Sequence, residues 1–268
     1  MGTMESGMIS SRSNLKIKKI KKLQKSTKAR KEEKAFVVEG PKMVFEAPKD
    51  QRLDCFVAIS FFKKHKDRIK EADLSFELVS DEVFLSLSET KTPQGILGVI
   101  KQNDYLLEEL LRPKGQTPLL LALESIQDPG NLGTIFRTAQ AAGVTGIMMN
   151  AKCADIYNPK TIRSTMGAIY RLPFMIASNF EEGLEKVKES GVKLVATHTK
   201  ATKSYDKENY QEATGFIIGN ESGGLTRGAL NLAQEWVRIP MKEQVESLNA
   251  AIATGILVYE AYRQRGLE

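Results

Sequence analysis

The chain is poor in the residues on which metal, disulfide and membrane functions depend. Its 268 residues include two cysteines, two histidines and one tryptophan. Cys55 and Cys153 lie far apart and form no CxxC pair, so we expect two reduced thiols in a cytoplasmic protein. Two histidines nearly exclude a zinc site of the Cys-His type, and we expect no metal. No apolar run approaches the ~20 residues of a membrane helix, and residues 1–10 lack the order of a secretory signal.

Positive charge is gathered at one end of the sequence. Residues 1–34 hold eleven Lys or Arg and three Glu, a net charge of +8, whereas the other residues sum to −2. Ile17, Ile20 and Leu23 recur at helical spacing among lysines, which predicts a helix with one apolar face. The basic side could be an ordinary solvated face, but charge this local favours a phosphate-binding arm. Three aliphatic residues without Trp would make a poor membrane-surface helix.

Short apolar runs alternate with helical patterns between residues 35 and 101. The patterns predict strands at 36–40, 55–60, 76–79 and 96–100, and helices at 41–47 and 82–87. Asp81 is the expected N-cap of the second helix. These elements form a small α/β module. Residues 102–117 are charged, contain a Leu-rich helical stretch and are punctuated by Pro113 and Gly115, which indicates a linker.

From Pro118 onward, strands and helices alternate. Strands are predicted at 119–123, 146–149, 172–176, 192–197 and 215–218, and helices at 132–142, 161–166, 180–190 and 247–263. Residues 119–123 are uninterruptedly apolar, which is typical of a strand buried on both faces of a parallel sheet. Pro173 makes 172–176 an edge strand. The rhythm predicts an α/β domain, residues 118–268, with a mostly parallel sheet.

Three segments of this domain place glycines and polar residues directly after apolar runs. They are DPGNLGTIFR (residues 128–137), IGNESGGL (218–225), and IPM with SLN (239–241 and 247–249). Ligands of open α/β sheets bind beyond the carboxyl ends of strands, so these segments are the candidate binding site. Glycines here allow close backbone approach to a ligand. Ser247 and Asn249 sit at the start of a predicted long helix, whose exposed N–H groups favour an anion.

Each of these residues also has an ordinary structural explanation. Asn131 could simply cap the helix that follows it, and Ser247 and Asn249 could cap the next one. Arg137 has apolar neighbours and needs an anionic partner, which could be a structural salt bridge. The glycines of residues 219–224 could form no more than a tight turn. Residues and spacing alone leave these alternatives open.

Taken together and in this order, the three segments resemble the motifs of the SpoU (TrmH-type) RNA ribose methyltransferases of the SPOUT superfamily. The resemblance covers roughly residues 118–265. It implies that the parallel sheet carries a deep trefoil knot in which S-adenosylmethionine binds. It also implies that residues 35–101 are a substrate-binding domain with a fold shared by some RNA-binding ribosomal proteins.

The resemblance also implies residue roles. In the active centre it points to Arg137 as the catalytic residue, with Asn131, Glu221, Ser222, Ser247 and Asn249 around it. Cofactor contacts are expected from Thr197, Gly219, Ile239, Met241 and Leu248. Relatives form homodimers through the C-terminal helix and share active-site residues across the interface, so we expect a dimer.

The expected function is therefore transfer of a methyl group from S-adenosylmethionine to a ribose 2′-OH of structured RNA. Ribosomal RNA is favoured over transfer RNA because a separate N-terminal module is present. Arg137 could act as a base or as an electrostatic stabiliser. A non-catalytic RNA-binding or ribosome-assembly protein is the alternative. A small-molecule enzyme of the Rossmann type is disfavoured, because it leaves the +8 segment unexplained and a full GxGxxG is lacking.

Overall fold

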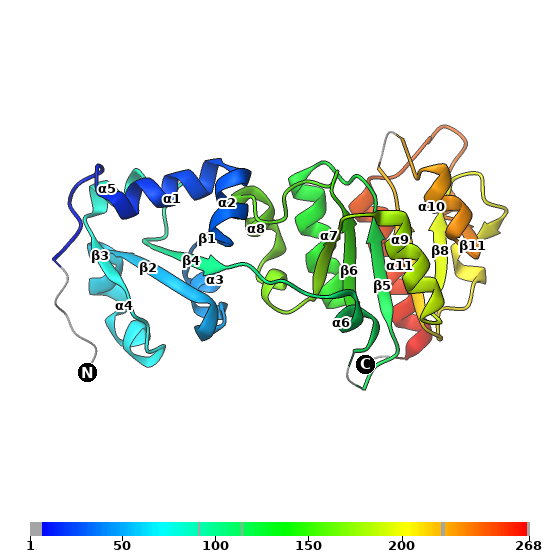
Figure 1. Cartoon of the computed structure of the whole chain (residues 1–268), viewed down its shortest axis with the longest axis horizontal. Helices are drawn as coiled ribbons and strands as arrows, with labels where there is room; N and C mark the ends of the chain where they lie inside the picture. The colour runs from blue at the N-terminus through cyan, green and yellow to red at the C-terminus, as the bar shows by residue number, and fades with distance from the viewer. Residues whose placement is uncertain (1–6, 91, 114, 221–222, 267–268) are drawn as a thin grey trace. The chain divides into compact units, whose positions relative to one another are not determined.

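The computed structural model describes residues 7–90, 92–113, 115–220 and 223–266 (Figure 1). The chain divides into two compact units. Unit 1 comprises residues 1–103 together with residues 157–170, and unit 2 comprises residues 104–156 and 171–268. The chain therefore passes between the units three times. No helix of the described residues is both long enough and apolar enough to cross a membrane.

Unit 1 is built around a four-stranded sheet in the order β1-β4-β2-β3. β4 is antiparallel to both β1 and β2, and β3 runs parallel to β2. The strands are β1 (Ala35–Glu39), β2 (Arg52–Ala58), β3 (Glu77–Val79) and β4 (Ile96–Lys101). The helices are α1 (Leu15–Lys25), α2 (Thr27–Glu33), α3 (Pro41–Glu46), α4 (Ile59–Glu71), α5 (Asp81–Leu85) and α8 (Pro159–Thr165). The α/β character expected from the sequence is confirmed.

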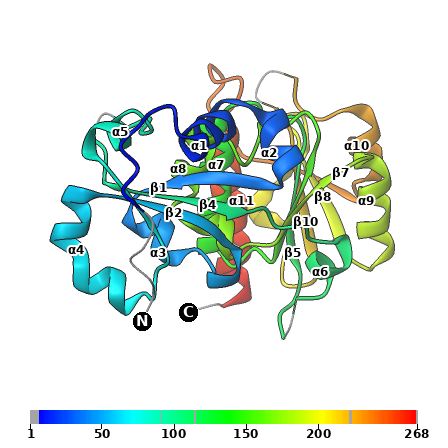
Figure 2. The same cartoon turned by 60° about the vertical axis from the view of Figure 1, so that its left-hand side comes forward.

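The basic N-terminal segment is part of this unit rather than an arm that stands apart from it. Ile17, Ile20 and Leu23 are almost fully buried, and α1 packs on β1 (Figure 2). The buried guanidinium of Arg30 donates to the carbonyls of Leu23 and Gln24, which satisfies two of the last acceptors of α1. The apolar face predicted from sequence is therefore the inner face of a packed helix, and its lysines lie outside.

One predicted cap in unit 1 is wrong by one residue. Ser80, not Asp81, is the N-cap of α5, because its side chain accepts from the backbone N–H of Val83. Asp81 is the first residue of the helix and accepts instead from the N–H and hydroxyl of Ser60. Ser and Asp are about equally good caps, so sequence could not choose between the two neighbours.

Unit 2 contains a seven-stranded sheet in the order β7-β6-β5-β10-β8-β11-β9. All neighbouring strands are parallel, and β7 lies at one edge, as expected from Pro173. The strands are β5 (Leu119–Leu123), β6 (Gly146–Asn150), β7 (Phe174–Ala177), β8 (Lys193–Thr197), β9 (Lys203–Ser204), β10 (Thr214–Ile218) and β11 (Glu235–Arg238). The helices are α6 (Leu107–Leu111), α7 (Pro129–Ala141), α9 (Phe180–Glu189), α10 (Arg227–Leu232) and α11 (Ala250–Arg265). The predicted parallel α/β domain is confirmed.

The two faces of this sheet are covered by different helices (Figure 1). One face buries a core formed with α6, α9 and α10, to which Leu110, Leu184 and Ala229 contribute. The other carries α7 and α11, which pack on each other. α6 comes from the expected linker, yet Leu107 and Leu110 are buried in this core, so residues 104–111 belong structurally to unit 2.

Residues 157–170 lie between β6 and β7 in sequence but pack in unit 1. The ring of Tyr157 packs at a tilt of 38° against Phe36 of β1, and its hydroxyl donates to the carbonyl of Asn103. The hydroxyl of Tyr170 donates to the carbonyl of Met43. Periodicity within 161–166 predicted the helix correctly but carries no information about which sheet it covers.

Candidate active site

The three motifs follow strands that are neighbours in the sheet. β5, β10, β8 and β11 lie side by side in that order and run parallel. Their carboxyl ends therefore meet at one edge, where the motif loops follow β5, β10 and β11. This is the position at which open α/β sheets bind ligands.

A buried carboxylate joins the loop after β5 to the loop after β10. Glu124 follows the last residue of β5 and is 5% exposed. Its two oxygens accept from the backbone N–H and the hydroxyl of Thr226, both at 2.9 Å. One residue on, the carbonyl of Ser125 accepts from Nδ2 of Asn220 at 2.9 Å. Sequence reasoning missed the role of Glu124, although an acid directly after an all-apolar strand is the signal for it.

The loop after β10 folds back so tightly that Gly219 tolerates no side chain. A Cβ there would lie 2.4 Å from the carbonyl carbon of Gly224, 2.5 Å from its oxygen and 2.7 Å from the nitrogen of Leu225. The N–H of Gly224 donates to the carbonyl of Asn220, which closes the turn. Gly224 itself has φ +63°. The sequence predicted that a ligand approaches the backbone closely at Gly219. In the structure, the atoms closest to this position belong to Gly224 and Leu225 of the same loop. Glu221 and Ser222 lie outside the described residues.

Asn131 is not the cap of α7. Asp128 holds that position, and its side chain accepts from the N–H of Asn131 at 2.7 Å. The side-chain oxygen of Asn131 instead accepts from Nδ2 of Asn249 at 3.0 Å. The capping explanation of Asn131 is therefore wrong, and its amide joins the first motif to the third.

Asn249 is the N-cap of α11, which begins three residues later than predicted. Its Oδ1 accepts from the N–H groups of Ala251 and Ile252, at 2.9 and 3.2 Å. Because the oxygen is held by the helix, the amide nitrogen is aimed at Asn131. Ser247 lies before the helix and is exposed.

Arg137 points outward from α7. It is exposed, while Ile135, Phe136 and Ala139 around it are buried. No hydrogen bond or ion pair joins its side chain to another described residue, so the structure offers no support for a salt bridge within that part of the chain. Arg137 and Asn131 are six residues apart, so their side chains leave the helix in directions that differ by about 120°. The structure therefore does not bring Arg137 and Asn131 together within one chain.

The residues expected around the cofactor line the same sheet edge. The hydroxyl of Thr197, at the end of β8, donates to the carbonyl of Ile217 at 3.1 Å. Ile239, Met241 and Leu248 are half-buried after β11. The backbone N–H groups of Met241 and Leu248 make no hydrogen bond to any described residue. Partly buried apolar side chains with unpaired N–H donors suit an adenine ring and its polar edge, so these residues fit the cofactor.

A polar network supports the end of β6 beside this edge. Oδ1 of Asn150 accepts from the N–H of Ser125, and its Nδ2 donates to the Ser125 hydroxyl. Cys153 donates weakly to the carbonyl of Leu123 at 3.4 Å, and burial raises the pKa of its thiol. Cys153 is therefore a protonated structural thiol, and both cysteines are free, as expected.

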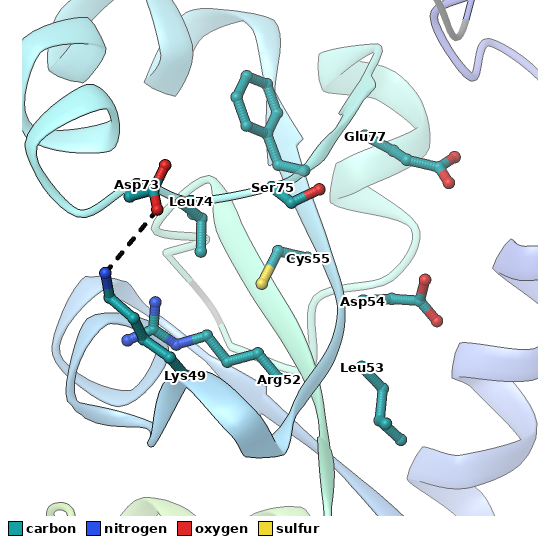
Figure 3. A pocket seen from close by; sticks show the side chains of 10 residues that line it. Lys49, Arg52, Leu53, Asp54, Cys55, Asp73, Leu74, Ser75 and Glu77 are labelled. Atoms are coloured by element: carbon teal, nitrogen blue, oxygen red, sulfur yellow. Dashed lines mark ion pairs between the residues drawn. The ribbon is translucent and has the colours of Figure 1, made fainter. Parts of the chain in front are cut away.

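A hollow of about 650 Å³ lies in unit 1 (Figure 3). It is bordered by the first half of β2 and the chain before β3. Arg52 lines this hollow, but its guanidinium already donates hydrogen bonds to the carbonyls of Phe45 and Ala47. Lys49 and Asp73 face each other at 3.9 Å but are 70% and 92% exposed. None of the predicted site residues lines this hollow.

Comparison with known proteins agrees with the geometry at the sheet edge. Residues 118–259 match the SpoU rRNA Methylase family. The chain belongs to this family. Residues 14–98 match the MRM3-like substrate binding domain, which confirms the expected substrate-binding module ahead of the methyltransferase domain.

Relatives of similar length support this assignment. The 23S rRNA (guanosine(2553)-2′-O)-methyltransferase RlmP of Bacillus subtilis is 33% identical over 227 residues, 84% of this chain and 87% of the relative. An uncharacterized tRNA/rRNA methyltransferase of Synechocystis is 39% identical over 199 residues, 74% of this chain and 71% of the relative. The crystal structure of an AdoMet-bound rRNA methyltransferase from Sinorhizobium meliloti matches with a TM-score of 0.82 at 30% identity, covering 96% of this chain and 97% of that one.

As a SpoU family member, the chain is an S-adenosylmethionine-dependent RNA 2′-O-methyltransferase. This activity accounts for the meeting of three separate loops at one edge of the sheet. The Glu124 clamp and the bond between Asn131 and Asn249 hold those loops together.

Proposed function

We propose that this protein methylates a ribose 2′-OH of ribosomal RNA, with residues 118–268 carrying out the transfer and residues 1–101 recognising the RNA. The observation that carries the proposal is the hydrogen bond between Asn131 and Asn249, which unites two motifs at the sheet edge. The ribosomal target is supported by the relatives whose names include 23S rRNA and by the substrate-binding module at residues 14–98. Such a substrate implies a cytoplasmic enzyme.

The proposed cofactor contacts come from the chain's own loops. When bound, S-adenosylmethionine supplies a methyl group on a sulfonium sulfur. The unpaired N–H groups of Met241 and Leu248 would bind its polar edges, and the side chains of Ile239 and Met241 would pack on its adenine. Gly219 keeps the turn after β10 closed so that this wall of the pocket stays in place, and Thr197 ties β8 to β10 behind it.

We assign the main catalytic role to Arg137. A guanidinium is a planar cation with five N–H donors and no acceptor. It is therefore suited to holding the phosphate beside the reacting nucleotide and to stabilising negative charge that develops on the 2′ oxygen. Asn131 and Asn249 orient the surrounding loops, while Ser247 and Glu221 are proposed to lie near the reacting ribose.

A homodimer would bring Arg137 to a partner's site. Ile252, Ile256 and Tyr259 recur at i, i+4 and i+7 on α11, and the first and last are 56% and 48% exposed. α11 packs against α7, the helix that carries Arg137. An apolar stripe beside an exposed, unpaired arginine supports an interface at which one chain supplies Arg137 and the other the cofactor loops.

The basic face of α1 is the proposed site for RNA phosphates. Lys18, Lys22 and Lys25 are exposed, stand at i, i+4 and i+7, and have no ion pair with a described residue. This spacing aligns them along one side of the helix, opposite the buried Ile17, Ile20 and Leu23. The trefoil knot implied by the family stays a prediction.

Ribose-methylation mapping of total RNA tests the proposal. RNA from cells with and without the gene should differ at one position or a few positions of ribosomal RNA. A difference confined to transfer RNA would favour the second candidate substrate, and an unchanged pattern would favour a non-catalytic RNA-binding protein. Calorimetry with S-adenosylmethionine separates the last case, because a non-catalytic protein with a closed pocket would release no heat of binding.

A further inference from the structure

Two aromatic rings stack on each other where β8 and β11 lie side by side. The rings of His198 and Trp236 lie 5.3 Å apart between centroids and are inclined by 30°. Trp236 is on β11 and His198 directly follows β8, so each is held by a strand. The N–H of His198 also donates to the carbonyl of Val237, which continues the pairing of the two strands.

The tryptophan is anchored on one side and open on the other. Its Nε1 donates to the carbonyl of Leu230 at the end of α10, at 3.1 Å. Nevertheless, Trp236 is 40% exposed, so part of its ring is open to solvent although its Nε1 is held. A fixed, exposed ring beside a second ring is a stacking surface rather than a disordered apolar residue.

Positive charge lies on the same face as these rings. Trp236 and Arg238 are two residues apart on one strand and therefore project from the same face of the sheet. Val237 pairs with Thr197, so His198, one residue beyond Thr197, also lies on the face of Arg238. Arg238 is exposed and makes no hydrogen bond or ion pair with a described residue.

We propose that His198 and Trp236 form a platform on which one unpaired base of the substrate RNA stacks, while Arg238 holds the adjoining phosphate. Bases stack on aromatic side chains whatever their sequence, because every base has a π-face, and a nearby arginine supplies the complementary charge. The platform rests on the proposed function, since its ligand is the RNA of that reaction. It would hold a nucleotide of the bound RNA in place without reading its sequence.

This platform is distinct from the cofactor pocket. Thr197 and Val237 project from the opposite face of the sheet, since they alternate with His198 and Trp236. Replacing Trp236 should therefore leave affinity for S-adenosylmethionine unchanged. An effect on RNA binding without an effect on the cofactor separates the two sites.

Intrinsic fluorescence reads the platform directly, because Trp236 is the single tryptophan of the chain. The full-length protein is titrated with a single-stranded oligoadenylate of about eight nucleotides, within the usual ~4–16 nucleotide range of such grooves. Binding is followed in parallel by the anisotropy of a dye on the RNA. We expect tryptophan emission to be quenched with the same midpoint as the anisotropy change. An abasic oligomer of equal length should bind more weakly and quench little.

The RNA affinity of substituted proteins provides a second test of the platform. Trp236→Leu should weaken oligoadenylate binding about 5- to 100-fold, the range for loss of one stacked base, whereas Trp236→Phe should retain most of the affinity. Arg238→Gln should lower the salt dependence of binding. Lys188→Gln is the matched control, because Lys188 is exposed near the end of α9, which leads into the opposite end of β8.

The outcomes separate the platform from the enzyme's function. RNA that binds and is methylated while tryptophan emission stays constant would overturn the platform and leave the proposed function intact. Equal losses of RNA affinity in Trp236→Leu and Trp236→Phe would also contradict stacking, because phenylalanine keeps an aromatic face. A protein that binds no RNA at any salt concentration would contradict both proposals.

Discussion

Asn249 donates a hydrogen bond to Asn131 across 118 residues of sequence, at 3.0 Å. The same Asn249 side chain caps α11 with its oxygen. One amide therefore performs two separable tasks, since the oxygen stabilises the helix and the nitrogen connects the third motif to the first. Asparagine suits both tasks because its acceptor and its donors lie on two different atoms of one planar amide.

Asn249→Asp separates these tasks. A carboxylate still accepts from the N–H groups of Ala251 and Ile252 and is favourable at a helix N-terminus, but it cannot donate to Asn131. We expect the free energy of unfolding to stay within about 1 kcal/mol of the original value and single-turnover methyl transfer to fall ~10-fold or more, as for loss of one oriented hydrogen bond.

The matched control is Asn179→Asp at the N-cap of α9, where the asparagine also accepts from a helix N–H. This variant should keep both stability and activity. If Asn249→Asp transferred methyl at the original rate, the link between the two asparagines would have no part in the reaction.

Gly219 and Gly223 belong to the same loop, but replacing each by alanine should affect cofactor binding differently. In Gly219→Ala the new Cβ would lie within 2.7 Å of backbone atoms of Gly224 and Leu225, which cannot move aside as a side chain would. We expect binding of S-adenosylmethionine to be lost, measured by calorimetry. A Cβ at Gly223 meets nothing within 4 Å, so Gly223→Ala should bind normally. Equal affinities in the two variants would contradict the assignment of Gly219 to the pocket wall.

The sequence predicted the parallel sheet because its strands are unbroken apolar runs, as at Leu119–Leu123. It predicted the site segments because their polar residues follow such strands. It could not assign Asn131, because a cap is chosen by backbone geometry and Asp128 was an equally good candidate. An acid directly after the apolar strand marked Glu124 for attention, but its partner Thr226 could not be predicted, because the two residues are 102 apart in sequence.

The boundary between the units also needed the structure. The charged, Pro- and Gly-punctuated composition of residues 102–117 is typical of a linker, but two leucines within it complete the core of unit 2. Residues 157–170 follow the strand–helix rhythm of unit 2, yet their apolar side chains are buried in unit 1. A fragment that begins at Pro118 would therefore lack part of its own core and expose Ile162 and Ile169.

Leu110→Ala tests whether the predicted linker contributes to stability. Leu110 is 1% exposed in the unit 2 core, so truncation should reduce the free energy of unfolding by about 2–5 kcal/mol. Leu106→Ala is the control. Leu106 is 64% exposed, so this substitution should lower the free energy of unfolding by less than about 0.5 kcal/mol. Urea unfolding measures both. Indistinguishable midpoints would mean that α6 is only a tether.

Exposed isoleucines on two elements test the proposed dimer. Ile252 on α11 is 56% exposed and Ile176 on β7 is 49% exposed. Ile252→Lys should shift the protein from dimer to monomer and reduce methylation, because an unpaired charge would be buried at the interface. Ile176→Lys should change neither. Light scattering at micromolar concentration reports the state, and a fully active wild-type monomer would refute the interface.

The most direct measurement is single-turnover transfer of a labelled methyl group from S-adenosylmethionine to RNA by wild type and Arg137→Ala. A 2′-O-methyl group blocks alkaline cleavage at its own nucleotide, so product from the wild type should appear as labelled alkali-resistant dinucleotides. Arg137→Ala should bind the cofactor within a few-fold and transfer about 10²-fold more slowly or worse, and Arg137→Lys should recover little if a bidentate fork is required. Label in alkali-labile mononucleotides, or an unchanged rate in Arg137→Ala, would contradict the account.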